Sequence, residues 1–159
     1  DCLINNAGIA TMNHALLTSI KEVKNVLDVN FIGVFLASRE AAKLMKRNKF
    51  GRIINISSIH TNFNIKGTSI YGASKSAVEQ FTVVLSNEIL QYGITANVLS
   101  LSIVEDTGMS NAIGADVHDE ILSKSKSKNY VKAVEVIENI NYLMSSKAND
   151  YSGKIIQIG

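Results

Sequence analysis

The chain has 159 residues, of which 46% are hydrophobic and 19% charged, and its 16 basic and 14 acidic side chains leave a net charge of +2. This composition is typical of one globular domain or of a large piece of one. The single cysteine, Cys2, excludes an internal disulfide and a multi-cysteine metal site, and it favours a reducing, cytoplasmic setting. No apolar run approaches the roughly 18 residues of a membrane helix. The nearly balanced charge provides no excess of basic residues that would bind nucleic acid. We therefore expect neither a membrane nor a nucleic-acid partner.

Two kinds of hydrophobic pattern alternate along the chain. Short apolar and β-branched runs bounded by turn residues predict strands at residues 1–5, 52–57, 94–102 and 153–159. Apolar residues at three- and four-residue steps predict helices at residues 19–48, 69–92 and 131–146. Gly93 ends the second helix in the manner of a C-terminal glycine cap. Residues 105–129 lack strong periodicity, and we expect a mobile excursion there with at most a short helix.

This order of elements predicts an α/β fold in a single domain. Strands that alternate with helices of this length need crossover connections, so we expect a parallel sheet with helices on both faces. The first strand has the apolar character of a central strand, yet no earlier residue pairs with one of its edges. Because an open apolar edge invites pairing, the sequence is expected to be the later part of a larger fold. Cys2 is expected to pack within this strand.

Tyr71 and Lys75, in the segment YGASK, are candidate catalytic residues. They are four residues apart near the start of a predicted helix, so their side chains lie on one face, one turn apart. A phenol has a pKa near 10, and a neighbouring ammonium lowers that pKa toward the range in which the phenol exchanges a proton with a carbonyl or alcohol oxygen. Taken alone, such a pair is more often an ordinary surface pair.

Other polar residues are expected at the same edge of the sheet. Ser57 and Ser58 follow the second strand, and the cluster NNAG at 5–8 follows the first. Open parallel sheets bind their ligands at the carboxyl ends of the strands, so these residues should face one crevice. Each feature also occurs as a simple strand end or turn. Their joint occurrence with Tyr71 and Lys75 favours a functional site.

Six segments together resemble the short-chain dehydrogenase/reductase family, and most closely its bacterial 3-oxoacyl-acyl-carrier-protein reductase branch. They are DCLINNAG at 1–8, NVLDVNFIGVF at 25–35, GRIINISS at 51–58, YGASK at 71–75, YGITANVLS at 92–100 and SGKIIQIG at 152–159. The resemblance implies the C-terminal part of a Rossmann-type, doubly wound parallel sheet. It also implies hydride transfer between NADP or NAD and a carbonyl or alcohol substrate, with a 3-oxoacyl thioester as one candidate.

The resemblance implies four catalytic residues. Tyr71 would be the general acid that protonates the carbonyl oxygen, or the base in the reverse direction. Lys75 would lower the pKa of Tyr71 and hold the ribose hydroxyls of the nicotinamide half. Ser58, rather than Ser57, would donate a hydrogen bond to the substrate oxygen. Asn30 would interrupt the long helix and hold a water that links Lys75 to solvent as a proton relay.

The resemblance also implies where the cofactor lies. The cofactor-binding residues would be Asn6, Ala7, Gly8, Tyr71, Lys75, Val104 and Thr107. Gly8 would allow close backbone approach, and Val104 and Thr107 would lie near the nicotinamide carboxamide. His60 falls where family members contact the substrate, although a loop histidine is more often an ordinary polar residue. No histidine pair has metal-ligand spacing, so no metal is predicted.

The chain departs from the family pattern in two places. Family members begin with a strand and the glycine-rich turn TGxxxGxG, which receives the pyrophosphate, and no glycines in this sequence have that spacing. Either the sequence belongs to a longer enzyme, or a natural truncation has left a cofactor-free structural or binding remnant. The second departure is Leu101-Ser102, which stands where the family usually has Pro-Gly.

We also expect the protein to self-associate and to have a lid over its substrate. The helices at 19–48 and 71–92 carry more apolar surface than one sheet covers, and relatives pair these helices across a two-fold axis. We therefore expect a homodimer or homotetramer. Residues 105–129 are expected to form the lid over a small carbonyl or acyl-thioester substrate.

Overall fold

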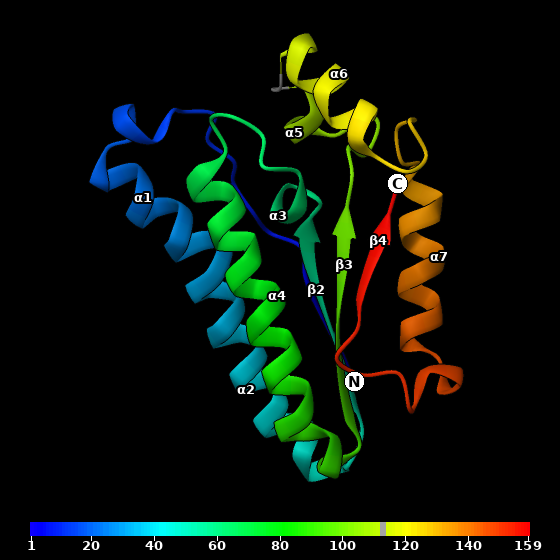
Figure 1. Cartoon of the computed structure of the whole chain (residues 1–159). Coiled ribbons are helices and arrows are strands. Elements are labelled where there is room, and N and C mark those ends of the chain that lie inside the picture. Colours follow the sequence, from blue (N-terminus) through cyan, green and yellow to red (C-terminus); the bar gives the residue numbers. More distant parts are fainter. Residues whose placement is uncertain (112–113) are drawn as a thin grey trace.

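The centre of the molecule is a four-stranded parallel sheet (Figure 1). The computed structural model describes residues 1–111 and 114–159. The strands are β1 (Cys2–Asn5), β2 (Gly51–Ser58), β3 (Ile94–Leu101) and β4 (Ile155–Ile158), and they lie in that order across the sheet. The predicted α/β fold and parallel sheet are confirmed, and β2 is one residue longer at each end than the 52–57 expected.

Helices connect the strands and cover both faces of the sheet. The described α-helices are α1 (Ile20–Leu27), α2 (Gly33–Asn48), α3 (His60–Phe63), α4 (Ser69–Ile89), α5 (Gly108–Asn111), α6 (Ala115–Lys124) and α7 (Ala133–Met144). A 3₁₀ turn at Leu90–Tyr92 extends α4, and Gly93 ends it in the left-handed region with φ 72°. The glycine cap predicted at this position is confirmed.

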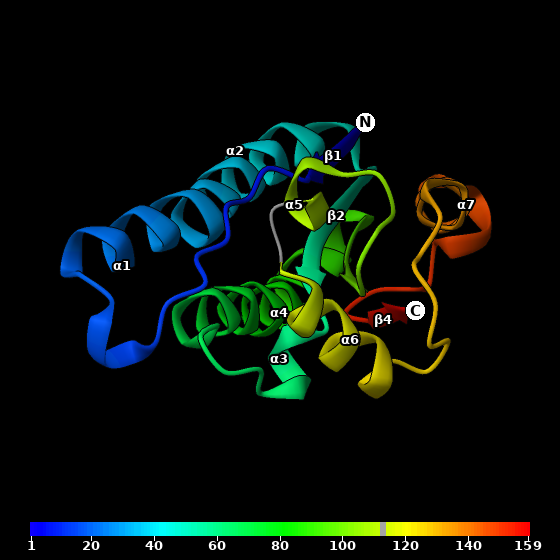
Figure 2. The same cartoon turned by 90° about the horizontal axis from the view of Figure 1, so that it is seen from above.

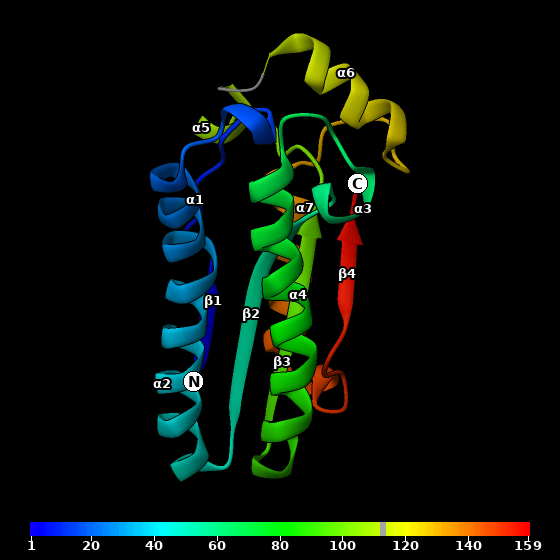
Figure 3. The same cartoon turned by 60° about the vertical axis from the view of Figure 1, so that its left-hand side comes forward.

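Two apolar clusters pack the helices onto opposite faces of the sheet. The cluster under α2 and α4 contains Met45, Ile53, Leu85, Ile89, Ile94 and Ala96. The cluster under α7 contains Ile54, Ile56, Leu99, Val131, Leu143 and Ile158. Figure 3 shows α2 and α4 in front of the strands and α7 behind them. Neighbouring strand residues such as Ile53 and Ile54 alternate between the two clusters, as the two-residue period of a strand requires.

The connection from β3 to β4 has the opposite hand from the two connections before it. The four parallel strands follow one another in one direction across the sheet, yet the crossover helix changes face between α4 and α7. This arrangement is uncommon, because about 98% of such crossovers are right-handed. The connection carries α5 and α6 across the carboxyl ends of the strands (Figure 2).

The helix predicted at 19–48 is two α-helices joined by a π turn. Ser19 begins α1 with a capping box, in which the Ser19 hydroxyl accepts from the Glu22 amide at 3.2 Å and the Glu22 carboxylate accepts from the Ser19 amide at 2.9 Å. The π turn covers Asp28–Ile32 and contains Asn30, which is fully buried. The helix is therefore interrupted at Asn30, where the family resemblance placed the interruption.

Strand β1 differs from one expectation. Within the described sheet β1 pairs with β2 alone, and its residues alternate between exposed and half-buried. Cys2 is exposed, so the expectation that it packs within the strand is wrong. The reason is its position: Cys2 is the first residue of β1, where neither of the two apolar clusters reaches it.

The segment 105–129 is more structured than its weak periodicity indicates. It contains α5 and α6, whereas at most one short helix was expected, and residues 112–113 of it lie outside the described part. A third apolar cluster packs α6 against the rest of the domain, because Ile121 contacts Ile59, Ile65 and Ile103. Among the residues that the structure describes, no helix is long and apolar enough to cross a membrane.

Candidate active site

A cavity of about 380 Å³ opens at the carboxyl ends of β1, β2 and β3. Most of the predicted site residues line it: Asn6, Ala7, Gly8, Ser58, His60, Tyr71, Lys75, Val104 and Thr107. Asn30 is the exception and lies behind the wall, against Gly8. The structure therefore brings together segments that are as far apart in the sequence as β1 and α5.

The two serines at the end of β2 have different surroundings because successive strand residues point to opposite sides. The Ser57 hydroxyl donates to Glu79 Oε1 at 2.8 Å. Ser58 Oγ lies 2.8 Å from His60 Nδ1, and Ser58 lowers the pKa of the neighbouring Tyr71 phenol. Ser58 is therefore the serine beside the phenol, whereas Ser57 holds α4 against the strand.

Tyr71 is buried in the first turn of α4. Its hydroxyl points toward Met109 Sδ at 3.8 Å, and its ring meets the His60 ring edge to face with centroids 5.3 Å apart. Burial raises the pKa of Tyr71, and the neighbouring Ser58 hydroxyl only partly opposes this. The expected lowering of the pKa by Lys75 is thus not the dominant effect, since Lys75 Nζ lies 5.9 Å from the ring centroid.

Lys75 lies one turn further along α4 and is 4% exposed. Its ammonium donates to the Ile56 carbonyl at 2.9 Å. Burial lowers the pKa of Lys75 from 10.5 to about 8, because the interior disfavours the charged form. Gly8 lies directly against this group: a Cβ on Gly8 would be 3.3 Å from Nζ and 3.4 Å from Asn30 Oδ1.

Asn30 ties the loop after β1 to α4. Its Oδ1 accepts from the Ile9 amide at 2.8 Å, and its Nδ2 donates to the Ile9 carbonyl at 2.8 Å and to Ser74 Oγ at 3.0 Å. The Ser74 hydroxyl in turn donates to the Tyr71 carbonyl at 2.7 Å. The π turn thus delivers one amide side chain that fixes the backbone on both sides of the cavity.

The far wall is formed by the segment after β3. Val104 pairs with Val131 in a parallel bridge, and the Thr107 hydroxyl donates to Ser110 Oγ at 3.0 Å and lies 3.3 Å from the Val104 carbonyl oxygen. Thr107 therefore closes the first turn of α5. Ser102, which stands where the family has glycine, is 8% exposed, and its hydroxyl has no hydrogen-bond partner in the described part of the chain.

A comparison of the sequence with models of known protein families shows to which family the chain belongs. The model of the short chain dehydrogenase family matches residues 1–118, which is well over half of the chain. The chain belongs to the short-chain dehydrogenase family. The cluster of Ser58, Tyr71 and Lys75 lies entirely within the matched residues.

Individual relatives agree with this family membership. The chain is 33% identical over 158 residues to a 3-oxoacyl-acyl-carrier-protein reductase of Buchnera aphidicola, and 31% identical over 159 residues to that of Staphylococcus epidermidis. Each match covers 99% of the chain and 64% of the relative, so the chain spans about two thirds of the length of these relatives. A structure of 4-hydroxyisoleucine dehydrogenase complexed with NADH superposes with a TM-score of 0.83 at 28% identity, covering 99% of the chain and 66% of that protein.

Two residues of this short-chain dehydrogenase site were missed in the sequence. Glu79 receives hydrogen bonds from Ser57 and from Thr61, the second at 3.3 Å. Its spacing gave a signal, because Glu79 is four residues beyond Lys75 and lies on the same helix face. Met109 contacts the Tyr71 hydroxyl from the aperiodic segment, where no sequence pattern marks it.

Proposed function

We propose that the protein is an NAD(P)H-dependent oxidoreductase that interconverts a carbonyl and an alcohol. The observation that carries the proposal is the meeting of Ser58, Tyr71 and Lys75 in one cavity at the ends of the strands. A hydroxyl and a phenol together provide two hydrogen-bond donors for one substrate oxygen, and a buried ammonium lies behind the phenol. Membership of the short-chain dehydrogenase family supports this function.

The residues around Gly8 fit the ribose and nicotinamide end of the cofactor. A Cβ at Gly8 would lie 3.3 Å from Lys75 Nζ and 3.4 Å from Asn30 Oδ1, so the glycine lets this loop pack closely on the ammonium that would hold the ribose. Lys75 has three N–H donors and the Ile56 carbonyl takes one, which leaves two for ribose hydroxyls. The cofactor, NAD or NADP, supplies the hydride when it is bound. Asn6, Ala7, Val104 and Thr107 complete the proposed binding set.

The side chains in the cavity can supply the proton that the carbonyl oxygen receives during reduction. In reduction, Tyr71 donates its proton to the carbonyl oxygen as that oxygen gains negative charge, and its raised pKa keeps the phenol protonated at neutral pH. Ser58 donates a second hydrogen bond to the same oxygen. With a pKa of about 8, Lys75 is mostly charged at pH 7, and its ammonium stabilises the phenolate that remains.

The proton on Tyr71 must then be replaced. We assign to Asn30 the role of holding the loop at Ile9 and α4 at Ser74 in register, so that Lys75 is connected to solvent through a bound water. In the reverse reaction the same route takes away the proton that Tyr71 removes from the alcohol.

The cavity wall supports a substrate with an apolar chain. Met12, Ile56, Leu101, Ile103 and Met109 line the cavity beside the polar cluster. Such a wall suits an acyl chain, and the relatives at 31–33% identity are named as 3-oxoacyl-acyl-carrier-protein reductases. We therefore propose a 3-oxoacyl thioester as the substrate class, with the segment 105–129 as its lid.

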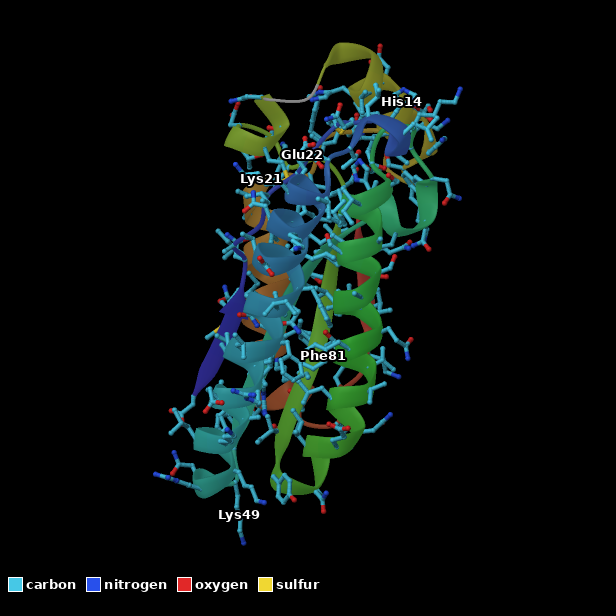
Figure 4. All side chains as sticks on the ribbon, turned by 90° about the vertical axis from the view of Figure 1, so that its left-hand side faces the viewer. His14, Lys21, Glu22, Lys49 and Phe81 are labelled. Carbon is cyan, nitrogen blue, oxygen red and sulfur yellow. The ribbon has the colours of Figure 1, made fainter. Side chains whose placement is uncertain are left out.

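The faces of α2 and α4 support self-association. Exposed apolar side chains on the two helices include Phe35, Leu36, Leu44 and Val84, at 37–60% exposure. Figure 4 looks onto these helices, with Phe81 of α4 lying between them, where its ring packs on Phe31 and Phe35. We propose a homodimer or homotetramer formed through residues 19–48 and 71–92. Light scattering of the full natural protein should give a multiple of the monomer mass, and a monomer alone would contradict this.

Calorimetric titration tests the proposed function. NADPH and NADH are titrated separately into the full natural protein, and we expect saturable binding of at least one. Absence of binding by both would defeat the oxidoreductase proposal and leave the alternative of a cofactor-free structural or binding remnant.

A further inference from the structure

His60 lines the candidate active site, but its imidazole has no role in the proposed reaction as described above. It is the first residue of α3, two residues after the end of β2, and its side chain lines the cavity with Ser58 and Tyr71. Its Nδ1 is 2.8 Å from Ser58 Oγ, and its ring stands edge to face on the Tyr71 ring. The imidazole thus contacts both groups that would face the substrate oxygen.

Close contacts fix the backbone that carries His60. Ile59 is 2% exposed, its amide donates to the Leu101 carbonyl at 3.1 Å, and its carbonyl accepts from the Asn62 amide at 2.9 Å. On the other side, a Cβ on Gly72 would lie 3.4 Å from the His60 carbonyl oxygen, so the first turn of α4 packs closely on this backbone. The backbone thus holds the Cα of His60 in place, and the contacts with Ser58 and the Tyr71 ring orient the imidazole.

A hydroxyl has one proton, and the bond to His60 decides where that proton points. If His60 carries its proton on Nε2, Nδ1 is an acceptor and the Ser58 proton is directed away from the substrate. If the proton is on Nδ1, Ser58 accepts that N–H, and its own proton remains for the substrate oxygen. Nε2 has no hydrogen-bond partner in the described part of the chain, so only a proton on Nδ1 meets a protein acceptor.

We propose that His60 is a positioning residue whose Nδ1–H donates to Ser58 Oγ and so reserves the Ser58 hydroxyl proton for the substrate oxygen. The catalytic part of this inference rests on the proposed function. Burial supports a neutral imidazole, since it lowers the pKa of His60 to about 4. Hydrogen bonds in series strengthen one another, so a Ser58 hydroxyl that accepts from His60 is also a better donor.

The first test reads the tautomer directly and does not depend on activity. Nitrogen-15 NMR of the imidazole side chains at pH 7 distinguishes a protonated ring nitrogen from a bare one, and the His60→Asn spectrum identifies the His60 signals among the three histidines. We expect the proton on Nδ1. A proton on Nε2 would overturn the proposal whether or not the protein is an enzyme.

The second test uses two amides that differ in where they place the N–H. The Asn amide nitrogen occupies the place of Nδ1, whereas the longer Gln side chain carries its amide at the place of Nε2. With acetoacetyl-coenzyme A and NADPH or NADH, His60→Asn in the full natural protein should keep kcat within about threefold. His60→Gln should lower kcat about 10- to 100-fold with little change in KM, because a misdirected oxyanion donor costs up to about 10²–10³ in rate.

The controls separate the possible failures. His14→Asn makes the same change at an exposed histidine and should behave as the wild type. Equal losses in His60→Asn and His60→Gln would overturn the positioning role, because a purely structural histidine predicts that result. A wild-type protein without turnover would count against the proposed function, and the tautomer measurement would still decide the position of the His60 proton.

Discussion

Asn30 and Ile9 exchange two hydrogen bonds, one from the Ile9 amide to Asn30 Oδ1 and one from Asn30 Nδ2 to the Ile9 carbonyl, both at 2.8 Å. This pair joins the π turn to the loop after β1, and Asn30 is fully buried. The loop that carries Gly8 therefore depends on an amide side chain from a different element.

Removal of the Asn30 amide should be costly for stability. Asn30→Ala leaves the Ile9 amide and carbonyl without their partner, and each buried unsatisfied group costs about 1–3 kcal/mol. We expect the free energy of unfolding in urea to fall by about 2–4 kcal/mol. Lys24→Ala, on the exposed side of α1, is a suitable control and should change it by less than about 0.5 kcal/mol. A similarly small effect of Asn30→Ala would show that the pair is not structural.

Lys75 should stabilise the fold less than an apolar residue does. Its pKa is about 8 in the folded state against 10.5 for the free group, so at pH 7 the folded protein must hold a charge that burial disfavours. Lys75→Met should therefore raise the free energy of unfolding at pH 7 by about 2 kcal/mol, after allowance for the lost hydrogen bond to the Ile56 carbonyl.

The sign of the pH dependence checks this cause. Between pH 8 and 10.5 the unfolded state binds more protons at Lys75 than the folded state, so wild-type stability rises with pH relative to Lys75→Met. Denaturation curves of both proteins across this range should converge as the pH rises. A constant difference from pH 7 to 10.5 would rule out desolvation of the ammonium as the reason.

His60 should make the fold sensitive to acid. Burial lowers the pKa of His60 from 6.5 to about 4. Between these two pH values the imidazole is therefore protonated in the unfolded state and neutral in the folded state. Stability should fall by about 2 kcal/mol more in the wild type than in His60→Asn as the pH drops from 6.5 to 4. An NMR titration in which His60 gains its proton near pH 6.5 would contradict this prediction.

Gly93 is a glycine that the backbone requires. Its φ is 72°, and a Cβ at this position would overlap the Lys49 carbonyl oxygen. Gly93→Ala should lower the free energy of unfolding by about 2 kcal/mol or more, since the left-handed region alone costs a residue with a side chain about 1–2 kcal/mol. Gly33→Ala is the matched control: Gly33 is helical, and a Cβ there would meet only the Asp28 carbonyl oxygen at an ordinary contact distance of 3.5 Å, so the free energy of unfolding should rise by about 0.5–1 kcal/mol. Equal effects of the two substitutions would refute the conformational argument.

The sequence was informative where a local pattern determines the structure. β-Branched residues predicted β2, and the four-residue spacing of Tyr71 and Lys75 placed both side chains in the cavity. Periodicity alone could not reveal the π turn at Asn30, because apolar residues continue at helical steps through it. The pKa of Tyr71 was predicted in the wrong direction because it depends on burial, and burial arises from tertiary packing.

The segment after β3 was the least predictable part of the site. The contact of Met109 with the Tyr71 hydroxyl is formed by α5, a four-residue helix whose short sequence has no periodicity to read. The packing of Ile121 on Ile59, Ile65 and Ile103, which follow β2, α3 and β3, likewise joins parts of the chain that no local pattern relates.

Turnover by Tyr71→Phe is the most direct test of the proposed proton donor. The full natural protein and the variant are compared by the oxidation of NADPH or NADH in the presence of acetoacetyl-coenzyme A, with cofactor binding measured in parallel by calorimetry. Because a positioned acid contributes about 10²–10⁴ in rate, kcat should fall at least about 100-fold while the cofactor dissociation constant stays within about threefold. A variant that reduces the substrate at the wild-type rate would contradict the account.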